Sequence, residues 1–121
     1  MFCYQCEQTG KGTGCTASGV CGKDAETAAL QDLLVYATKG IAMYGHRARK
    51  FSAKDRAVDV FMLKALFSAV TNVNFDTARL QKLLVEAATL KEMAKGLYEN
   101  ACKKANIQAE QLAGPAAWIP A

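Results

Sequence analysis

Apolar residues return every three or four positions through most of the chain, from about residue 24 to residue 106. That spacing places them on one side of an α-helix. The stretches around residues 50–55 and at "TNVNFD" (71–76) interrupt the pattern, and no segment alternates with a period of two for long. The pattern therefore predicts three amphipathic helices in an all-α fold. The three stripes are Leu30, Leu34, Ala37, Ile41 and Tyr44, then Val58, Phe61, Met62, Ala65, Leu66, Ala69 and Val70, then Leu83, Ala87, Leu90, Ala94, Leu97 and Ala101.

Polar residues suited to capping stand just before each stripe. A side-chain oxygen at that position accepts a hydrogen bond from a backbone N–H of the first turn. Ser52 followed by Asp55 resembles a capping box, although the usual acid there is Glu. The first helix is expected to end near Lys50, where basic side chains suit the negative end of the helix dipole. The candidate caps are Asp24 for the first helix, Ser52 with Asp55 for the second, and Asn74 or Asp76 for the third.

The chain divides into three parts within one domain. Residues 1–23, the N-terminal loop, hold five glycines that disfavour a helix. Residues 24–106 are predicted to form an up-down-up three-helix bundle, because short connections favour antiparallel neighbours. Gly40 is expected to let a neighbour approach the first helix closely. Residues 107–121, the tail, are expected to be irregular and truncated from a longer chain; a tail packed back on the bundle is the alternative.

Composition excludes several classes of protein. The 121 residues are 51% hydrophobic and carry a formal net charge of +4 with scattered basic residues, which does not suggest nucleic-acid binding. No apolar run approaches the roughly 20 residues of a membrane-spanning helix. The first residues have neither the basic nor the apolar region of a signal peptide. We therefore expect a cytoplasmic protein with no membrane contact.

Four of the five cysteines fall in the N-terminal loop, as Cys3-x2-Cys6-x8-Cys15-x5-Cys21. Clustered cysteines in a reducing compartment point to metal or redox chemistry. Four thiolates match the four irons of a [4Fe–4S] cubane, and the glycines let backbone N–H groups approach the sulfurs. Structural zinc and two disulfides remain as alternatives, although four-cysteine zinc sites usually come as two closely spaced pairs.

Other loop residues suggest how such a cluster is tuned. Phe2 and Tyr4 are placed to shield it from water. The amine of Met1, Lys11 and Lys23 adds positive charge, which favours the more negative, reduced form. The positive end of the first helix is expected to act in the same direction.

The remaining cysteine and the single histidine have simpler interpretations. Cys102 lies beside the apolar stripe of the third helix and is expected to be a small buried hydrophobe. His46 lies in a basic helix end, with Arg47, Arg49 and Lys50, and is expected to be solvated. The alternative for this basic end is a docking site for an acidic electron carrier.

The sequence resembles a known family at several places. "MFCYQCEQT" and "GCTASGVCGK" resemble the N-terminus of hybrid cluster proteins, also called prismane proteins or hydroxylamine reductases, and "LQDLLVYATKGIA" and "LFSAVTNVNFD" resemble the helices that follow. The resemblance covers essentially the whole chain. It implies that Cys3, Cys6, Cys15 and Cys21 bind a cluster near the protein surface, and their spacing is similar to that of members with a [4Fe–4S] cubane.

The chain also departs from that family, whose members are several times longer. The second centre of those proteins, a hybrid iron–sulfur–oxygen cluster where hydroxylamine or nitric oxide is reduced, takes its ligands from regions beyond this chain. Neither His46 nor Cys102 matches one of them. The resemblance implies an electron-transfer region that works with a redox partner protein and with missing catalytic domains or a separate catalytic chain. The alternative is a zinc-binding structural or interaction module.

Overall fold

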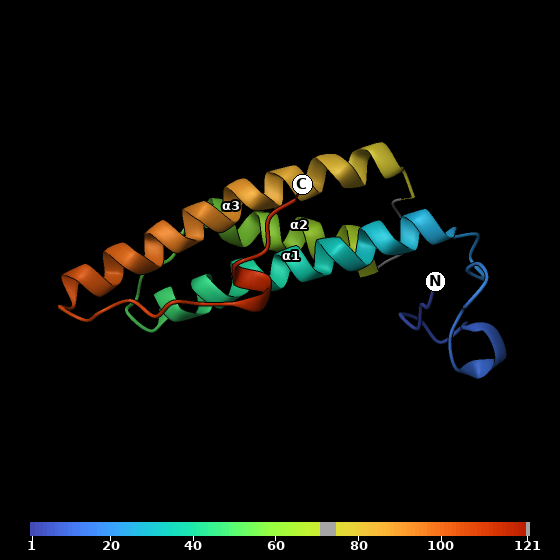
Figure 1. Cartoon of the computed structure of the whole chain (residues 1–121), viewed down its shortest axis with the longest axis horizontal. Coiled ribbons are helices and arrows are strands. Elements are labelled where there is room, and N and C mark those ends of the chain that lie inside the picture. The colour runs from blue at the N-terminus through green and yellow to red at the C-terminus, as the bar shows by residue number, and fades with distance from the viewer. Residues whose placement is uncertain (71–74, 121) are drawn as a thin grey trace.

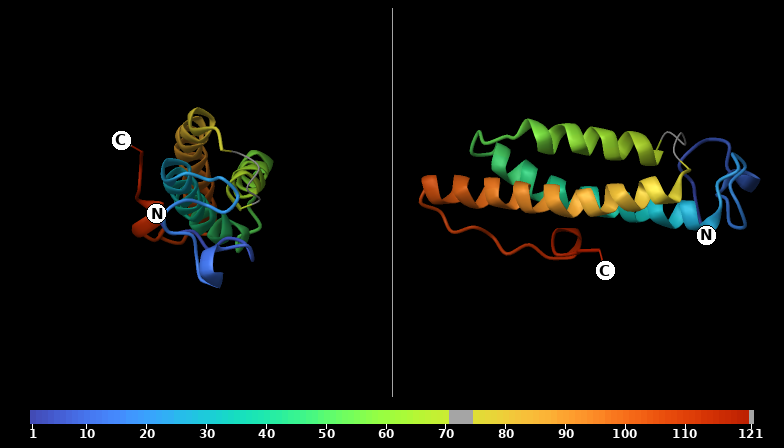
Figure 2. Two further views of the ribbon diagram at one scale, coloured as in Figure 1. Left: turned by 90° about the vertical axis from the view of Figure 1, so that its right-hand side faces the viewer. Right: turned by 90° about the horizontal axis from the view of Figure 1, so that it is seen from above.

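Three long helices lie side by side in the computed structural model of this protein, which describes residues 1–70 and 75–120 (Figure 1). The second helix runs antiparallel to the first, and the third helix runs parallel to the first (Figure 2). The predicted all-α, up-down-up three-helix bundle is confirmed. Its elements are the 3-10 turn η1 (Gly10–Gly12), α1 (Ala25–Arg49), α2 (Arg56–Val70), α3 (Thr77–Lys104) and the 3-10 turn η2 (Gly114–Ala116).

The core lies mainly between α1 and α3, which share the largest interface of the bundle. Leu34 and Ile41 of α1 and Leu80 of α3 are fully buried. The rings of Tyr44 and Tyr98 meet in the same core, with their centroids 6.1 Å apart. Burying one leucine or isoleucine side chain stabilises a fold by roughly 1.5–3 kcal/mol, so each of these fully buried side chains contributes substantially to the stability of the bundle.

Aspartates cap the first and third helices. The Asp24 carboxylate accepts a hydrogen bond from Thr27 N at 2.8 Å, and α1 begins one residue later. Asp76 accepts from Ala78 N at 3.0 Å and Arg79 N at 3.2 Å. Both predicted aspartate caps are confirmed, whereas the other candidate for α3, at position 74, lies outside the described residues.

The predicted cap of α2 is wrong. Asp55, not Ser52, caps this helix, because its carboxylate accepts from Ala57 N at 2.7 Å and Val58 N at 3.4 Å. Ser52 stands in the preceding turn with φ of 61°, a left-handed conformation. The chain leaves α1 through a tight turn in which Ser52 N–H donates to the Arg49 carbonyl. This turn delays the start of α2 until after Asp55.

The apolar stripe predicted for α2 is only partly buried. Val58 and Phe61 face the core, but Leu66 and Val70 are 39% and 48% exposed, and Leu63 is 70% exposed. α1 and α3 cover one side of α2, and its apolar surface is wider than that side. Even so, no helix within the described ranges is long and apolar enough to cross a membrane.

The tail packs back on the bundle, on the side of α1 and α3 opposite to α2 (Figure 2). Gly40 permits this contact, because a Cβ atom there would lie 2.8 Å from the carbonyl carbon of Pro115. The buried Lys91 side chain donates from Nζ to the Trp118 carbonyl at 2.5 Å. The Trp118 ring meets Tyr36 edge-on, with centroids 6.1 Å apart. The expected close-packing role of Gly40 is confirmed.

Candidate metal centre

The N-terminal loop sits at the amino end of α1, beyond the body of the bundle (Figure 1). The backbones of two of its cysteines, Cys3 and Cys15, form an isolated antiparallel β-bridge. Cys3 N–H donates to the Cys15 carbonyl at 2.9 Å, and Cys15 N–H donates to the Cys3 carbonyl at 2.8 Å. The bridge folds the loop on itself, because these residues lie twelve positions apart in the chain.

The sulfur of Cys15 is surrounded by backbone donors. Cys15 is 7% exposed, and Gly10 N–H points at its Sγ over 3.3 Å. The hydrogen bonds from the backbone of Gly10 and then of Val20 lower the pKa of the Cys15 thiol below its usual value, with a smaller contribution from the charge of Lys23. The thiolate is the form that binds metals. The predicted approach of glycine backbone to a cysteine sulfur is present at this residue.

Gly14 brings an aromatic ring against the chain next to Cys15. A Cβ atom at Gly14 would lie 2.7 Å from Cζ of Phe2, so a side chain there would force that ring to shift. The Phe2 ring also contacts Tyr4, with centroids 5.4 Å apart. Phe2 is 53% and Tyr4 72% exposed, so a large part of each ring faces solvent.

A lysine approaches the sulfur of Cys3 from inside the loop. Lys23 is only 1% exposed, and its Nζ lies 3.5 Å from Cys3 Sγ and 3.3 Å from Gln5 Oε1. The backbone of the same lysine is held by Gly19 N–H, which donates to its carbonyl at 2.7 Å. A buried ammonium with a sulfur partner suits an anionic sulfur ligand.

The other two loop cysteines, Cys6 and Cys21, are exposed, and all five cysteines of the chain are free thiols. Among the described residues, no three His, Cys, Asp or Glu side chains gather closely enough to hold a single metal ion. The structure thus brings the backbones of Cys3 and Cys15 together, and within the described ranges it does not gather three of the four loop cysteines at one point. N–H and ammonium donors around cysteine sulfur are the environment in which iron–sulfur clusters are found. The residues present therefore fit a cluster held by sulfur.

A groove of about 620 Å³ runs from the loop to α1 and α2. It passes beside Cys3, so this cysteine borders open space, whereas Cys15 is buried. The residues that line it are Phe2, Cys3, Tyr4, Gln5, Asp32, Val35, Tyr36, Lys39 and Val70.

Comparison with known proteins identifies the family. Residues 1–117 match the Prismane/CO dehydrogenase family. The chain belongs to this family.

Several relatives of this chain within the family are named hydroxylamine reductase. Those of Rhodospirillum rubrum and Methanocella arvoryzae are each 50% identical to it over 121 residues, which is 100% of this chain and 22% of the relative. That of Geobacter sulfurreducens is 50% identical over 98% of this chain and 22% of the relative. The predicted resemblance is confirmed, and the chain spans about a fifth of the length of these relatives.

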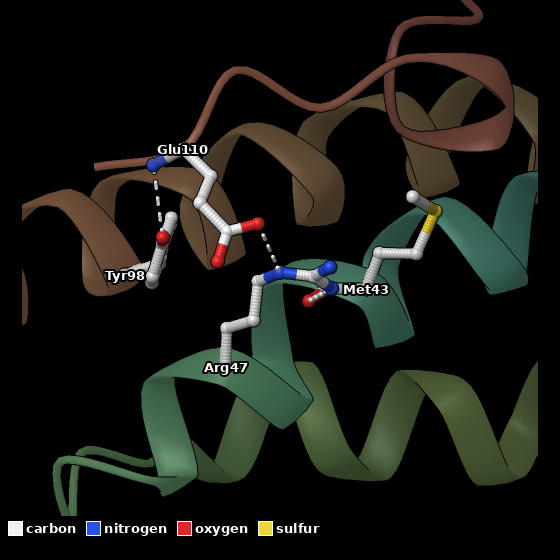
Figure 3. A network of polar contacts seen from close by, with 4 residues as sticks. All are labelled: Met43, Arg47, Tyr98 and Glu110. Atoms are coloured by element: carbon white, nitrogen blue, oxygen red, sulfur yellow. Dashed lines mark hydrogen bonds and ion pairs between the residues drawn. The ribbon is translucent and has the colours of Figure 1, made fainter.

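The basic end of α1, around His46, Arg47 and Arg49, lies far from the N-terminal loop. α1 has 25 residues, and at 1.5 Å per residue that end lies about 37 Å from the loop. Arg47 donates from Nε to Glu110 of the tail at 3.4 Å and from Nη1 to the Met43 carbonyl at 3.0 Å, while Glu110 N–H donates to the Tyr98 hydroxyl at 3.0 Å (Figure 3). His46 is exposed, as expected. These contacts tether the tail to the basic end of α1.

One predicted residue lies where it was expected, and two loop residues contribute to the site without having been predicted. Cys102 is 1% exposed and belongs to the core of the bundle, as expected. The two residues that were not predicted are Gln5, which binds the Lys23 ammonium, and Val20, whose N–H acts on Cys15. The position of Gln5 between Cys3 and Cys6 could have marked it as a residue of the site. Only the folded loop shows that its partner is the Lys23 ammonium.

Proposed function

We propose that this chain is an iron–sulfur electron-transfer region of a hydroxylamine or nitric oxide reductase-like protein. Cys3, Cys6, Cys15 and Cys21 bind one [4Fe–4S] cluster, which relays single electrons. The observation that carries the proposal is the pair of sulfur environments, with Gly10 N–H 3.3 Å from Cys15 Sγ and an ammonium 3.5 Å from Cys3 Sγ. Hydrogen bonds to the sulfurs are among the features that set the potential of such a cluster.

Four cysteine ligands occupy all four corners of a cubane, so no iron is left open for a substrate. The bond-making chemistry then belongs to a catalytic hybrid cluster absent from this chain. This division agrees with the length of the relatives, of which the chain covers 22%. The proposed partners are a redox protein that supplies electrons and the catalytic domains, either downstream in one polypeptide or as a separate chain. The proposed location is the cytoplasm, where thiols stay reduced.

Metal analysis of anaerobically purified protein tests this function. We expect about four irons and four sulfides per chain, and an S = 1/2 EPR signal after reduction by dithionite. The variant Cys15→Ser should lose the cluster because it removes one ligand. Cys102→Ala is the matched control: it removes a cysteine of the core and should keep the full iron content.

Three results would contradict the proposal. One zinc per chain without sulfide would identify the structural zinc module instead. A full iron content in Cys15→Ser would show that the ligand assignment is wrong. Hydroxylamine reduction by the isolated chain, faster than by free cluster, would show that a catalytic centre is present here.

A further inference from the structure

The Lys23 side chain is buried at the base of the N-terminal loop, with 1% of its surface exposed. Lysines are almost never fully buried unless they are paired. Removing an ammonium from water costs several kcal/mol unless an opposite charge or hydrogen bonds offset that cost. The partners of this side chain therefore indicate which charge or hydrogen bonds offset the burial of its ammonium.

A cysteine sulfur and a neutral amide oxygen are the partners of the Lys23 ammonium among the described residues. The Lys23 ammonium lies 3.5 Å from Cys3 Sγ and 3.3 Å from the neutral amide oxygen of Gln5. Within residues 1–70 and 75–120, the ion pairs involve other cations, Arg47, Arg49 and Lys64. None of these ion pairs joins Lys23 to a carboxylate, so an anionic sulfur ligand at Cys3 would be the negative charge nearest to its ammonium.

Packing holds the lysine in place beside a second cysteine. A Cβ atom at Gly19 would lie 3.0 Å from Lys23 Cβ and 3.1 Å from Cys21 Sγ. The absence of a side chain at Gly19 thus lets the lysine stem and the Cys21 sulfur lie close together. The stem of Lys23 thus borders Gly19, and its ammonium reaches Cys3.

Lys11 offers a comparison within the same loop. It carries the same charge, but it is exposed in η1, and its φ of 58° belongs to a tight turn. Exposed charges act weakly because water and salt screen them, whereas a buried charge acts at low effective dielectric. Of the two lysines that the sequence presents as equivalent, only Lys23 is placed to act strongly on a cluster.

We propose that Lys23 is a positioning residue whose buried ammonium compensates the charge of the cluster bound by the loop cysteines and raises its midpoint potential. This inference rests on the proposed function. A [4Fe–4S] cluster with four thiolates carries a charge of about −2, and one electron from an external donor brings it to about −3. A nearby positive charge stabilises the more negative form more strongly.

Redox titration of the iron-loaded protein, followed by EPR with dithionite as the reductant, tests the role of Lys23. In Lys23→Met the equilibrium constant for reduction should fall about tenfold, which lowers the midpoint potential by about 59 mV for a one-electron couple. Lys23→Arg keeps the charge and should restore most of the potential. Lys11→Met is the matched control, and its potential should stay close to that of the unaltered protein.

Iron and sulfide content, measured on the same samples, separates the outcomes. A fully loaded Lys23→Met protein with an unchanged potential would overturn the assignment, as would an equal shift in Lys11→Met or in Lys23→Arg. Loss of the cluster in Lys23→Met but not in Lys23→Arg supports it, because the charge is then needed to hold the cluster. Loss in both variants overturns it in favour of a purely structural role. If the unaltered protein holds no iron and sulfide, the proposed function itself fails.

Discussion

The N-terminal loop and the helical bundle are built on different physical principles. The bundle buries side chains continuously along α1 and α3. The loop buries only Gly14, Cys15 and Lys23, and its backbone is held by a few hydrogen bonds around the Cys3–Cys15 bridge. The bundle is therefore expected to fold without metal, whereas the order of the loop should depend on what the cysteines bind.

The largest expected effect is on the loop, after removal of the metal. Chelation of the iron should increase the rate of trypsin cleavage after Lys11 by about tenfold or more, because a loop that loses its ligand opens locally. The helical circular dichroism signal should stay the same. Mass spectrometry of the fragments with time measures the first quantity. An equal loss of helical signal on chelation would show that the two regions are not independent.

Leu34→Ala should cause the largest loss of stability within the bundle. Leu34 is fully buried between the helices, and removing such a side chain costs about 2–5 kcal/mol in the free energy of unfolding. Urea unfolding followed by circular dichroism measures this loss. The control is Leu63→Ala, at a position 70% exposed on α2, where the change should stay within about 0.5 kcal/mol. Similar losses in the two variants would contradict the assignment of the core.

Gly40→Ala should destabilise the contact between α1 and the tail. The added methyl group would meet the Pro115 carbonyl, and overpacking of this kind costs about 1–3 kcal/mol. Trp118 is the only tryptophan, so a red shift of its fluorescence should report displacement of the tail. Gly96→Ala is the matched control, because nothing lies within 4 Å of its added atom, and it should stabilise α3 by about 0.5–1 kcal/mol. Stabilisation by both substitutions would show that the tail contact is loose.

The smallest effect is expected at Asp24, where the two regions join. The hydrogen bond from Thr27 N–H holds the pKa of the Asp24 carboxyl below its ordinary value. The stabilisation by the carboxylate is therefore complete above an unfolded pKa of about 4 and is lost as the pH falls through the lower folded pKa. The difference in unfolding midpoint between the unaltered protein and Asp24→Ala should shrink below about pH 4. Asp24→Asn keeps a capping oxygen without a charge, and it should lose this pH dependence.

Local rules were enough for much of the fold. Helical periodicity predicted all three helices, and short-range capping predicted Asp24 and Asp76, because both depend on residues within one or two turns. The prediction failed where long-range packing decides. Ser52 belongs to a turn that leaves α1, and Leu66 faces solvent because α1 and α3 cover only one side of α2.

The sequence by itself determined the class of the candidate site, since the number, spacing and glycine setting of the cysteines are properties of the chain. It also determined the bundle, through the period of its apolar residues. Only the tertiary structure decided which lysine of the loop is buried and which remains in water, because burial depends on how the loop folds on itself. It likewise decided that the tail lies on Gly40, a contact between residues about 75 positions apart that no local pattern encodes.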